Sequence, residues 1–355
     1  MRLLDGQLVL SPSDLTKFTR CAHVTTLDLG RLRGTLKPLA YPQRSLHTDF
    51  IAEKGTEHEK DYVERLARAG NRVIPIQGER KTAQDLRNAA AATIDAMNSG
   101  ADYINQAVFF DGKWVGYADL LERVGDGRYE VIDVKLARSP KAHALLQLAA
   151  YSEHLTRIQG VRPEKMHIIL GTKERATFRV ADFEAYYRYI KARYEAFCGG
   201  QPPSAVQTLP YIIDFCSLCE WNLHCWRHLE QLDHLVRVAN IRRDHVHRLE
   251  GADIKTLTKL GDTPNAHIEK IRDDTYAGLH QQARLQSEYT RTKTHRYELL
   301  TPEVERGFAL LPRPSKGDVF LDLEADPYAA GGITYLFGIA TADSAYRSWW
   351  AHDAL

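Results

Sequence analysis

Apolar positions in the N-terminal part of the chain recur with the period of an amphipathic helix. The pattern predicts a first helix that begins at Ser11-Pro12-Ser13, with Ser11 or Ser13 as its N-cap, and ends near Cys21. It predicts two further helices, over residues 51–69 and 81–98. The N-terminal hundred residues are therefore expected to be mainly helical.

Between Tyr103 and Lys135 the pattern changes to the alternation of a half-buried sheet. Turns at Asp111-Gly112 and Gly125-Asp126-Gly127 divide this stretch into three strands. The predicted elements of this region are strands over 103–110, 113–123, 128–135, 166–170 and 177–180, and helices over 141–158 and 182–197. This order predicts a compact α/β domain.

The rest of the chain has a different pattern. Residues 231–300 show helical periods only, and prolines between 301 and 317 indicate a linker. Strand-like segments return at 319–325, 335–340 and 346–350. We therefore expect an α/β domain over 8–230, a helical region over 231–300, the linker, and the start of a second α/β domain over 318–355.

Composition narrows the class of protein. The 355 residues are 26% charged and 44% hydrophobic, which excludes collagen-like, coiled-coil and wholly disordered chains. No apolar run reaches the roughly 18 to 20 residues of a membrane span, and the N-terminus lacks a signal peptide core, so we expect a cytoplasmic protein with no membrane partner. The net charge of +1 argues against capture of nucleic acid by the whole surface but leaves a local basic groove open.

The second and third strands carry the strongest candidate chemistry. If the turn is centred on Asp126, Asp119 faces Asp133 across the hairpin, and Lys135 projects from the same face. Opposed carboxylates repel each other, and a divalent cation such as Mg²⁺ or Mn²⁺ would offset this repulsion. A lysine beside it could orient or help to deprotonate a water that attacks phosphorus.

Two alternatives to this hypothesis stay open. The same register opposes Glu122 and Glu130 on the other face, where no metal is implied, and a bulge would shift every pair by one residue. The stretch could also be a solvated charged hairpin. His58 could add an imidazole ligand or lie on a helix surface. Gln147 and Tyr151 share a helix face and could hold a phosphate or a base edge, although Tyr151 could equally be a core residue.

Three of the five cysteines are clustered. Cys216, Cys219 and Cys225 form a C-x2-C-x5-C pattern, which suggests thiolate ligation of a metal. A four-ligand site would need Cys21 or Cys198 as well, or His224 if the metal is zinc. The alternative is a set of small buried hydrophobic residues.

These motifs together resemble the RecB-like nucleases of the PD-(D/E)xK superfamily. The matches run in family order, and they are Gly55-x-x-His58, Gly116-Tyr117-Ala118-Asp119, Asp133-Val134-Lys135 and Gln147-x-x-x-Tyr151. One cysteine upstream and three downstream are similar to the pattern of iron–sulfur nucleases, namely CRISPR-associated exonucleases and AddB-type helicase–nucleases. The resemblance covers roughly residues 8–230 and implies a restriction-endonuclease-like core closed by the cysteines.

The resemblance also implies roles for individual residues. It implies a [4Fe–4S] cluster (with Zn²⁺ as the alternative) on Cys21, Cys216, Cys219 and Cys225, which leaves Cys198 free. His58, Asp119 and Asp133, helped by the Val134 carbonyl, would bind the catalytic Mg²⁺ or Mn²⁺. Lys135 would position the nucleophilic water, and Gln147 and Tyr151 would lie near the scissile phosphate.

The C-terminal segments carry two further resemblances. Asp322-x-Glu324 on a strand resembles the start of a ribonuclease H-like DEDD exonuclease domain. Two more acidic ligands would lie downstream, so we expect this second site to be incomplete here and the chain to be a fragment. Leu249–Ile254 resembles a helix-hairpin-helix element, with a helical spacer as the alternative. The layout is similar to a group of uncharacterised RecB-like nucleases, some of which continue into a helicase.

The sequence thus predicts a metal-dependent nuclease that hydrolyses DNA phosphodiester bonds. Single strands or free ends are the expected substrates, in repair, recombination or defence. One alternative is a catalytically silent nucleic-acid-binding module of a larger helicase–nuclease. The other is a zinc-stabilised structural domain.

Overall fold

A computed structural model describes residues 1–37, 46–125, 127–200, 208–326, 329 and 332–352. The chain divides into two compact units, Met1–Thr294 and His295–Leu355, which are described one after the other. The predicted turn centre, Asp126, lies outside the described residues. Within them, every helix is too short or too polar to cross a membrane.

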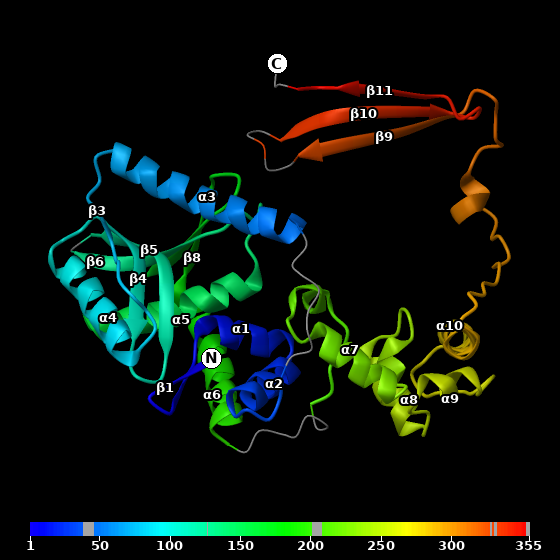
Figure 1. The fold of residues 1–355 in the computed structure, drawn as a ribbon, viewed down its shortest axis with the longest axis horizontal. Coiled ribbons are helices and arrows are strands. Elements are labelled where there is room, and N and C mark those ends of the chain that lie inside the picture. Colours follow the sequence, from blue (N-terminus) through cyan, green and yellow to red (C-terminus); the bar gives the residue numbers. More distant parts are fainter. Residues whose placement is uncertain (38–45, 126, 201–207, 327–328, 330–331, 353–355) are drawn as a thin grey trace. The chain divides into compact units, whose positions relative to one another are not determined.

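The first unit is built on a six-stranded mixed sheet (Figure 1). Its strands are β3 (Val73–Pro75), β4 (Tyr103–Phe110), β5 (Val115–Val124), β6 (Arg128–Val134), β7 (Lys165–Ile169) and β8 (Arg175–Arg179), and they lie side by side in that order. The pairs β3–β4 and β6–β7 are parallel, whereas the other neighbours are antiparallel. The strand β6 is buried on both faces from Tyr129 to Val134, and this buried stretch includes the acidic residues Glu130 and Asp133.

Helices cover both faces of this sheet. They are α3 (Leu46–Arg68), α4 (Ala83–Asn98), α5 (Ala142–Gln159) and α6 (Glu184–Gly199). A capping box of Thr82 and Asp85 starts α4. Leu86 of α4 and Leu148 of α5 belong to one core with the sheet, whereas Tyr62 of α3 packs on the opposite face. The structure is therefore a mixed α/β protein with a sheet flanked by helices.

The N-terminal segment packs against the far side of α5. It contains the hairpin β1 (Arg2–Leu4) and β2 (Gln7–Val9) and the helices α1 (Pro12–Arg20) and α2 (Ala22–Leu32). Ser11 is the N-cap of α1, because its side chain accepts a hydrogen bond from the backbone N–H of Asp14. Leu15 is fully buried in a core shared with α5 and α6.

A second, helical part of this unit has a core of its own. It contains the 3₁₀ turns η2 (Asp214–Leu218) and η3 (Leu235–Arg237) and the helices α7 (Asn222–Gln231), α8 (Arg243–Gly251), α9 (Leu257–Gly261) and α10 (Asp273–Thr292). Leu249, Leu260 and Leu279 lie in this core. The segment that resembles a helix-hairpin-helix joins the two short helices α8 and α9.

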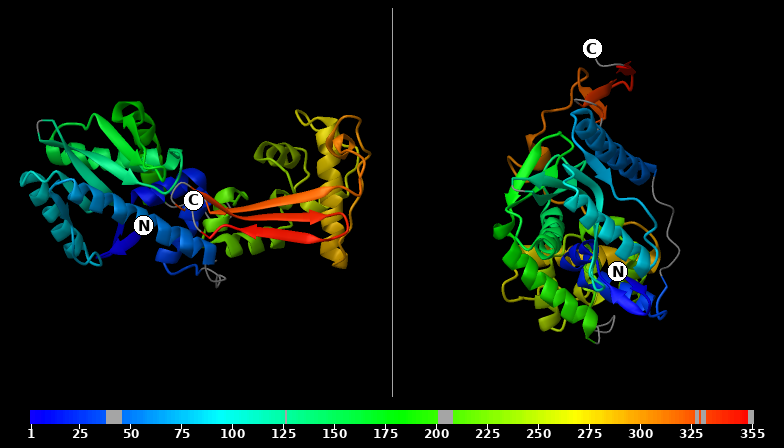
Figure 2. Two further views of the ribbon diagram at one scale, coloured as in Figure 1. Left: turned by 90° about the horizontal axis from the view of Figure 1, so that it is seen from above. Right: turned by 90° about the vertical axis from the view of Figure 1, so that its left-hand side faces the viewer.

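The second unit contains a small antiparallel sheet in the order β11-β10-β9. Its elements are η4 (Gly307–Leu310), β9 (Val319–Asp326), β10 (Ile333–Thr341) and β11 (Tyr346–Trp350). Figure 2 shows the three strands as a single layer. Of the residues described in this unit, only Gly338 is buried. Large apolar side chains such as Phe320 and Trp350 are exposed, at 64% and 57%.

The predicted order of long elements is confirmed. Each predicted strand and helix is present within a few residues of its expected bounds, and Ser11 is the N-cap. The sequence analysis missed α2 and the short strands β1, β2 and β3. Three-residue strands leave no recognisable alternation, and they form here because neighbouring elements supply their hydrogen bonds.

Candidate active site and cysteine centre

The hairpin β5–β6 has the register that the sequence predicts. Its ladder runs from Val124↔Arg128 to Leu120↔Ile132, one position short of Asp119 and Asp133. The ladder contains no bulge, so both carboxylates project from the same face of the sheet.

The opposed glutamates on the other face each have their own partners. Glu122 pairs with the Arg175 guanidinium and accepts a hydrogen bond from the Tyr103 hydroxyl at 2.7 Å. Glu130 pairs with His167 at 2.9 Å and accepts from the Lys165 backbone N–H at 2.8 Å. These partners offset the repulsion of the glutamates without a metal.

Lys135 stands between the two aspartates. Its Nζ lies 2.7 Å from Asp133 Oδ1 and 3.5 Å from Asp119 Oδ2. The backbone N–H of Val134 also donates to Asp119 Oδ2, at 2.8 Å. One backbone donor and one ammonium group therefore hold the two carboxylates close together at the end of the hairpin.

Burial strongly affects the protonation of this group. The Asp133 side chain is 1% exposed, and its Oδ2 has no hydrogen-bond partner among the described residues. Burial raises the pKa of Asp133 against the opposing effect of the Lys135 charge. Burial lowers the pKa of Lys135, but the two carboxylates outweigh it and the net shift is upward. The lysine therefore stays charged.

Glu59 of α3 is a further acidic residue at this site, and the sequence analysis missed it. Burial raises the pKa of Glu59, the Asp119 charge raises it further, and Lys135 opposes both. Gln106 donates a hydrogen bond to Glu59. Gln106 has a φ of 56° and interrupts the β4–β5 ladder opposite Asp119. The only signal in the sequence was an acid next to His58 on one helix.

The predicted metal ligand His58 lies on α3, close to Leu170 at the end of β7. Burial lowers the pKa of His58, and a hydrogen bond with the Leu170 carbonyl opposes this shift. The charges that act on it are those of Asp61, Lys173 and Arg65, and its Nε2 is buried without a described partner. The ring therefore lies at the end of β7, whereas the neighbouring Glu59 lies in the field of Asp119.

Gln147 and Tyr151 form one unit on α5. Gln147 Nε2 donates to the Tyr151 hydroxyl at 2.6 Å. Burial raises the pKa of Tyr151, and the charges of Asp133 and Asp119 raise it further, so the hydroxyl lies within the field of the acidic pair. The ring of Tyr151 packs over Gly116, where an added Cβ would lie 2.8 Å from Tyr151 Cε1. The glycine makes room for the aromatic ring.

The donor atoms of this site fit a hard divalent cation. Carboxylate oxygens are the ligands that Mg²⁺ and Mn²⁺ prefer, and Asp133 Oδ2 is a buried acceptor that lacks a partner. The described residues contain no group of three or more His, Cys, Asp or Glu side chains already arranged to hold a metal. Lys135 occupies the space between the carboxylates instead.

Four of the five cysteines lie in each other's electrostatic field. Cys21 lies at the junction of α1 and α2, Cys216 lies in η2, Cys219 follows that turn, and Cys225 lies on α7. Burial raises the pKa of Cys225, and the other three thiols raise it further. Burial also raises the pKa of Cys198, to about 11, but the groups that act on that thiol are Tyr194, Asp14, Glu195 and the N-terminus.

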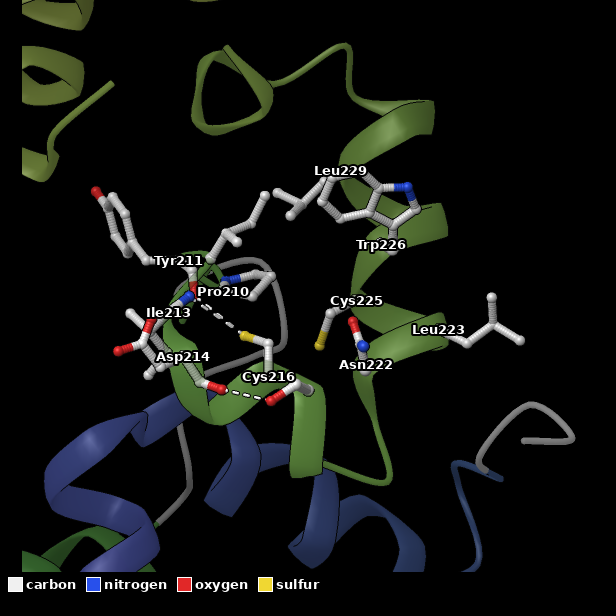
Figure 3. Close-up of a pocket in the computed structure, with 12 residues that line it drawn as sticks. Pro210, Tyr211, Ile213, Asp214, Cys216, Asn222, Leu223, Cys225, Trp226 and Leu229 are labelled. Carbon is white, nitrogen blue, oxygen red and sulfur yellow. Dashed lines mark hydrogen bonds between the residues drawn. The ribbon is translucent and has the colours of Figure 1, made fainter. Parts of the chain in front are cut away.

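A cavity of about 770 Å³ lies beside two of these thiols. In Figure 3 the sulfur atoms of Cys216 and Cys225 lie in the space between η2 and α7, with Trp226 and Leu229 along the cavity wall. Thiols are the donors that structural zinc and iron–sulfur clusters take. Among the described residues, however, no three of these cysteines are already arranged as a group that could hold a metal. The ring of His224 packs edge-on against Trp221 at 5.5 Å.

The segments that carry the cysteines are held together by other contacts as well. Trp221 is fully buried, and its Nε1–H donates to Asp28 Oδ1 at 2.8 Å. Asp28 also pairs with Arg31 at 3.0 Å. Trp221 packs with Val24 and Leu27 of α2, next to Cys219 and Cys225. The N-terminal helices and the cysteine segment are thus joined by a common small core.

In the second unit, Asp322 and Glu324 share one face of β9. Both line a shallow cavity of about 240 Å³ together with Phe320 and Gly338. Asp322 pairs across the sheet with Gly338, and Glu324 pairs with Leu336. The two acids are therefore neighbours on the exposed sheet surface, as the alternation of the strand predicted.

Comparisons with known proteins give little further information. No family model matches the chain, and no curated protein matches it. Among solved structures, one match is titled "Crystal structure of SSO0001", an archaeal protein. It is 16% identical with a TM-score of 0.22, and the match covers 60% of this chain and 94% of that chain. A likeness at this TM-score carries no argument about fold or function.

Proposed function

We propose that the chain is a metal-dependent nuclease that hydrolyses DNA phosphodiester bonds and belongs to the RecB-like PD-(D/E)xK nucleases. The observation that carries this proposal is the convergence of Asp119, Asp133 and Lys135, with a buried carboxylate oxygen that has no hydrogen-bond partner among the described residues. Single strands or free ends are the proposed substrates. A helicase domain or subunit is the proposed partner.

Each residue of the site has a distinct role in this proposal. A divalent cation held by Asp119 and Asp133, with His58 or Glu59 as a further ligand, would stabilise the negative charge that develops on the phosphate. The Lys135 ammonium, kept charged by the two aspartates, donates a hydrogen bond that orients the attacking water. Gln147 and Tyr151 donate hydrogen bonds to the scissile phosphate.

The test is a cleavage assay with labelled single-stranded DNA and either Mg²⁺ or Mn²⁺. We expect cleavage by the wild-type chain, and a loss of about 100-fold or more for Asp133→Ala and for Lys135→Ala. Glu164→Ala, at an exposed position, is the matched control. Activity that survives both site substitutions would refute the assigned site. Binding of DNA without turnover in any metal would instead support the silent module.

The cysteines are proposed to hold a [4Fe–4S] cluster, with zinc as the alternative. Cys21, Cys216, Cys219 and Cys225 are the proposed ligands, because each of them lies in the field of at least one other thiol of the set. Anaerobic purification should give a brown protein with bound iron and sulfide. We expect Cys225→Ser to lose the colour and Cys198→Ser to keep it. A colourless wild-type protein with stoichiometric zinc would contradict the cluster.

A further inference from the structure

A groove distinct from the acidic site lies where five parts of the first unit meet. It has a volume of about 660 Å³, and its walls come from the end of α1, the start of α2, α6, residues 208–213 and α8. Its basic lining residues are Arg20, Arg193, Arg243, His23 and His247. Glu250 is the single acidic residue among those that line it. We call this surface the arginine groove.

Aromatic rings hold the three arginines in place. The Arg243 guanidinium lies 4.1 Å from the ring centre of Tyr211, and that of Arg20 lies 4.3 Å from the ring centre of Phe215. Arg193 lies over Tyr189 at 5.4 Å. Within the part of the chain that the structure describes, no ion pair joins these arginines to a carboxylate. Arg193 donates one hydrogen bond to the Tyr189 hydroxyl, at 3.2 Å, and the other guanidinium N–H groups can donate to an external anion.

The acid in the groove lies beside two imidazole rings. Glu250 lies 3.6 Å from His234 Nε2 and 3.7 Å from His247 Nδ1. Tyr186 extends from the wall with 58% of its surface exposed. The groove thus combines fixed positive charge with an exposed aromatic ring.

His143 is near both the arginine groove and the candidate active site. Burial lowers the pKa of His143 at the start of α5, and the charges of Arg20 and Lys135 lower it further. One imidazole thus lies within the fields of both a groove arginine and the lysine of the acidic hairpin. At the other end, Arg243 and Cys21 both line the groove.

We propose that the arginine groove binds the sugar–phosphate backbone and bases of a single-stranded nucleic acid, beyond the segment held at the active site. This inference rests on the proposed nuclease function, because the strand in the groove would be the strand that is cut. Single-strand sites combine a basic channel with aromatic rings on which bases stack. An acidic peptide would use the arginines but would leave Tyr186 without a role.

The test is the affinity for a fluorescently labelled oligothymidylate, measured by anisotropy in EDTA so that cleavage does not interfere. The variants are Arg20→Ala, Arg243→Ala and Tyr186→Leu, with Tyr186→Phe as the conservative exchange. Arg87→Ala is the matched control, since Arg87 is an exposed arginine on α4 that lies outside the groove. Thermal unfolding of every variant checks that it is folded.

The variants should differ in a way that separates charge from stacking. We expect each arginine substitution to weaken binding roughly fivefold to tenfold and to reduce the slope of log affinity against log salt by about 0.7. We expect Tyr186→Leu to weaken binding about fivefold or more with the slope unchanged, and Tyr186→Phe to bind as the wild type does. Arg87→Ala should match the wild type in both measurements.

Several results would overturn this inference, and they can be told apart from failure of the proposed function. If the wild type cuts single strands but the groove variants bind them as tightly as the wild type, the groove inference alone is wrong. If the groove variants lose affinity for a polyglutamate probe but keep their affinity for DNA, the groove serves an acidic protein partner instead. If the wild type neither binds nor cuts single strands, both proposals are wrong.

Discussion

At the scale of single residues, cation binding at the site depends on the protonation state of one buried carboxyl group. Asp133 is almost fully buried, and Lys135 compensates only one of its two oxygens. Burial raises the pKa of Asp133, which means that the folded protein without a cation is destabilised when this group ionises. Binding of a cation therefore favours a charged carboxylate at this position, whereas the stability of the fold without a cation favours a neutral side chain.

Asp133→Asn should separate the effect of this charge on cation binding from its effect on stability. The amide cannot carry a charge, so we expect the free energy of unfolding without a cation to stay the same or to rise by about 1 kcal/mol. Cleavage should be lost, and the increase in melting temperature that Mg²⁺ or Mn²⁺ gives the wild type should disappear. Asp95→Asn, at an exposed position on α4, is the control. A variant that is strongly destabilised yet still shifted by the cation would contradict this assignment.

Gly116→Ala tests the placement of Tyr151. A methyl group at Gly116 would lie 2.8 Å from Tyr151 Cε1, and the ring is buried and cannot swing away freely. We expect a loss of about 1–3 kcal/mol in the free energy of unfolding, as for other overpacked cores. The turnover rate should also fall, because the Tyr151 hydroxyl moves relative to Gln147. Chemical denaturation and single-turnover cleavage measure the two effects.

The control for this exchange is Gly278→Ala on α10, where an added Cβ meets no atom within 4 Å. That substitution should leave cleavage intact and stabilise the helix slightly. Equal effects at both glycines would show that the ring contact is unimportant.

Residues of the site differ in how well the sequence predicts them. Asp119, Asp133 and Lys135 follow from strand alternation and the turn position, which are local properties of the hairpin. Whether His58 or Glu59 is directed toward the aspartates depends on the rotation of α3 about its axis. That rotation is set by the packing of Tyr62 against Leu120 and Ile132 of the sheet. Long-range packing of this kind leaves no local sequence signal.

At the scale of elements, two glutamates of the hairpin β5–β6 make the stability of the fold depend on pH. The pKa of Glu122 is lowered because Arg175 and Tyr103 outweigh its burial. The pKa of Glu130 is lowered because His167 and the Lys165 N–H outweigh its burial. A carboxyl group with a lowered folded pKa stabilises the protein fully above its unfolded value of 4.5, and this contribution is lost as the pH falls through the folded value.

Glu122→Gln should therefore reduce the acid sensitivity of unfolding. The variant is expected to be less stable than the wild type at neutral pH, and the difference should shrink as the pH falls below 4.5. Urea denaturation at a series of pH values measures this. The side chain of Glu164 is 78% exposed, so Glu164→Gln should show the same dependence of stability on pH as the wild type. A constant difference at all pH values would mean that the Arg175 pair does not act through the charge of Glu122.

Elements with a strong hydrophobic periodicity could be predicted from the sequence, whereas the shortest elements could not. The helix α4 presents a clear apolar face, and the glycine turns fix the ends of β5 and β6. The helix α2 was missed because nearly all of its first turns are buried, including polar His23, Thr25 and Asp28. Its polar groups are satisfied by partners distant in sequence, such as Thr208 and Trp221.

At the scale of the whole molecule, the two units differ in how they are stabilised. All of the described core clusters lie within Met1–Thr294, and α10 belongs to one of them through Tyr276, Leu279 and Ala283. Gln286 of α10 also bonds the backbone of Arg237 and Ala239. The described residues of His295–Leu355 contribute to no such cluster, and many of their large apolar side chains are exposed.

A chain that ends at Thr294 should therefore keep the properties of the first unit. We expect its main thermal transition and its cleavage of single strands to match those of the full chain, and its self-association to be weaker, because exposed side chains such as Phe308, Phe320 and Trp350 are removed. Calorimetry, the cleavage assay and light scattering measure these three properties. A chain that ends at Arg272 is the matched control, since it also lacks α10 and exposes Leu249 and Leu260 of the helical core. It should melt at a lower temperature, and equal melting of the two shortened chains would mean that the helical core contributes nothing to the stability of the first unit.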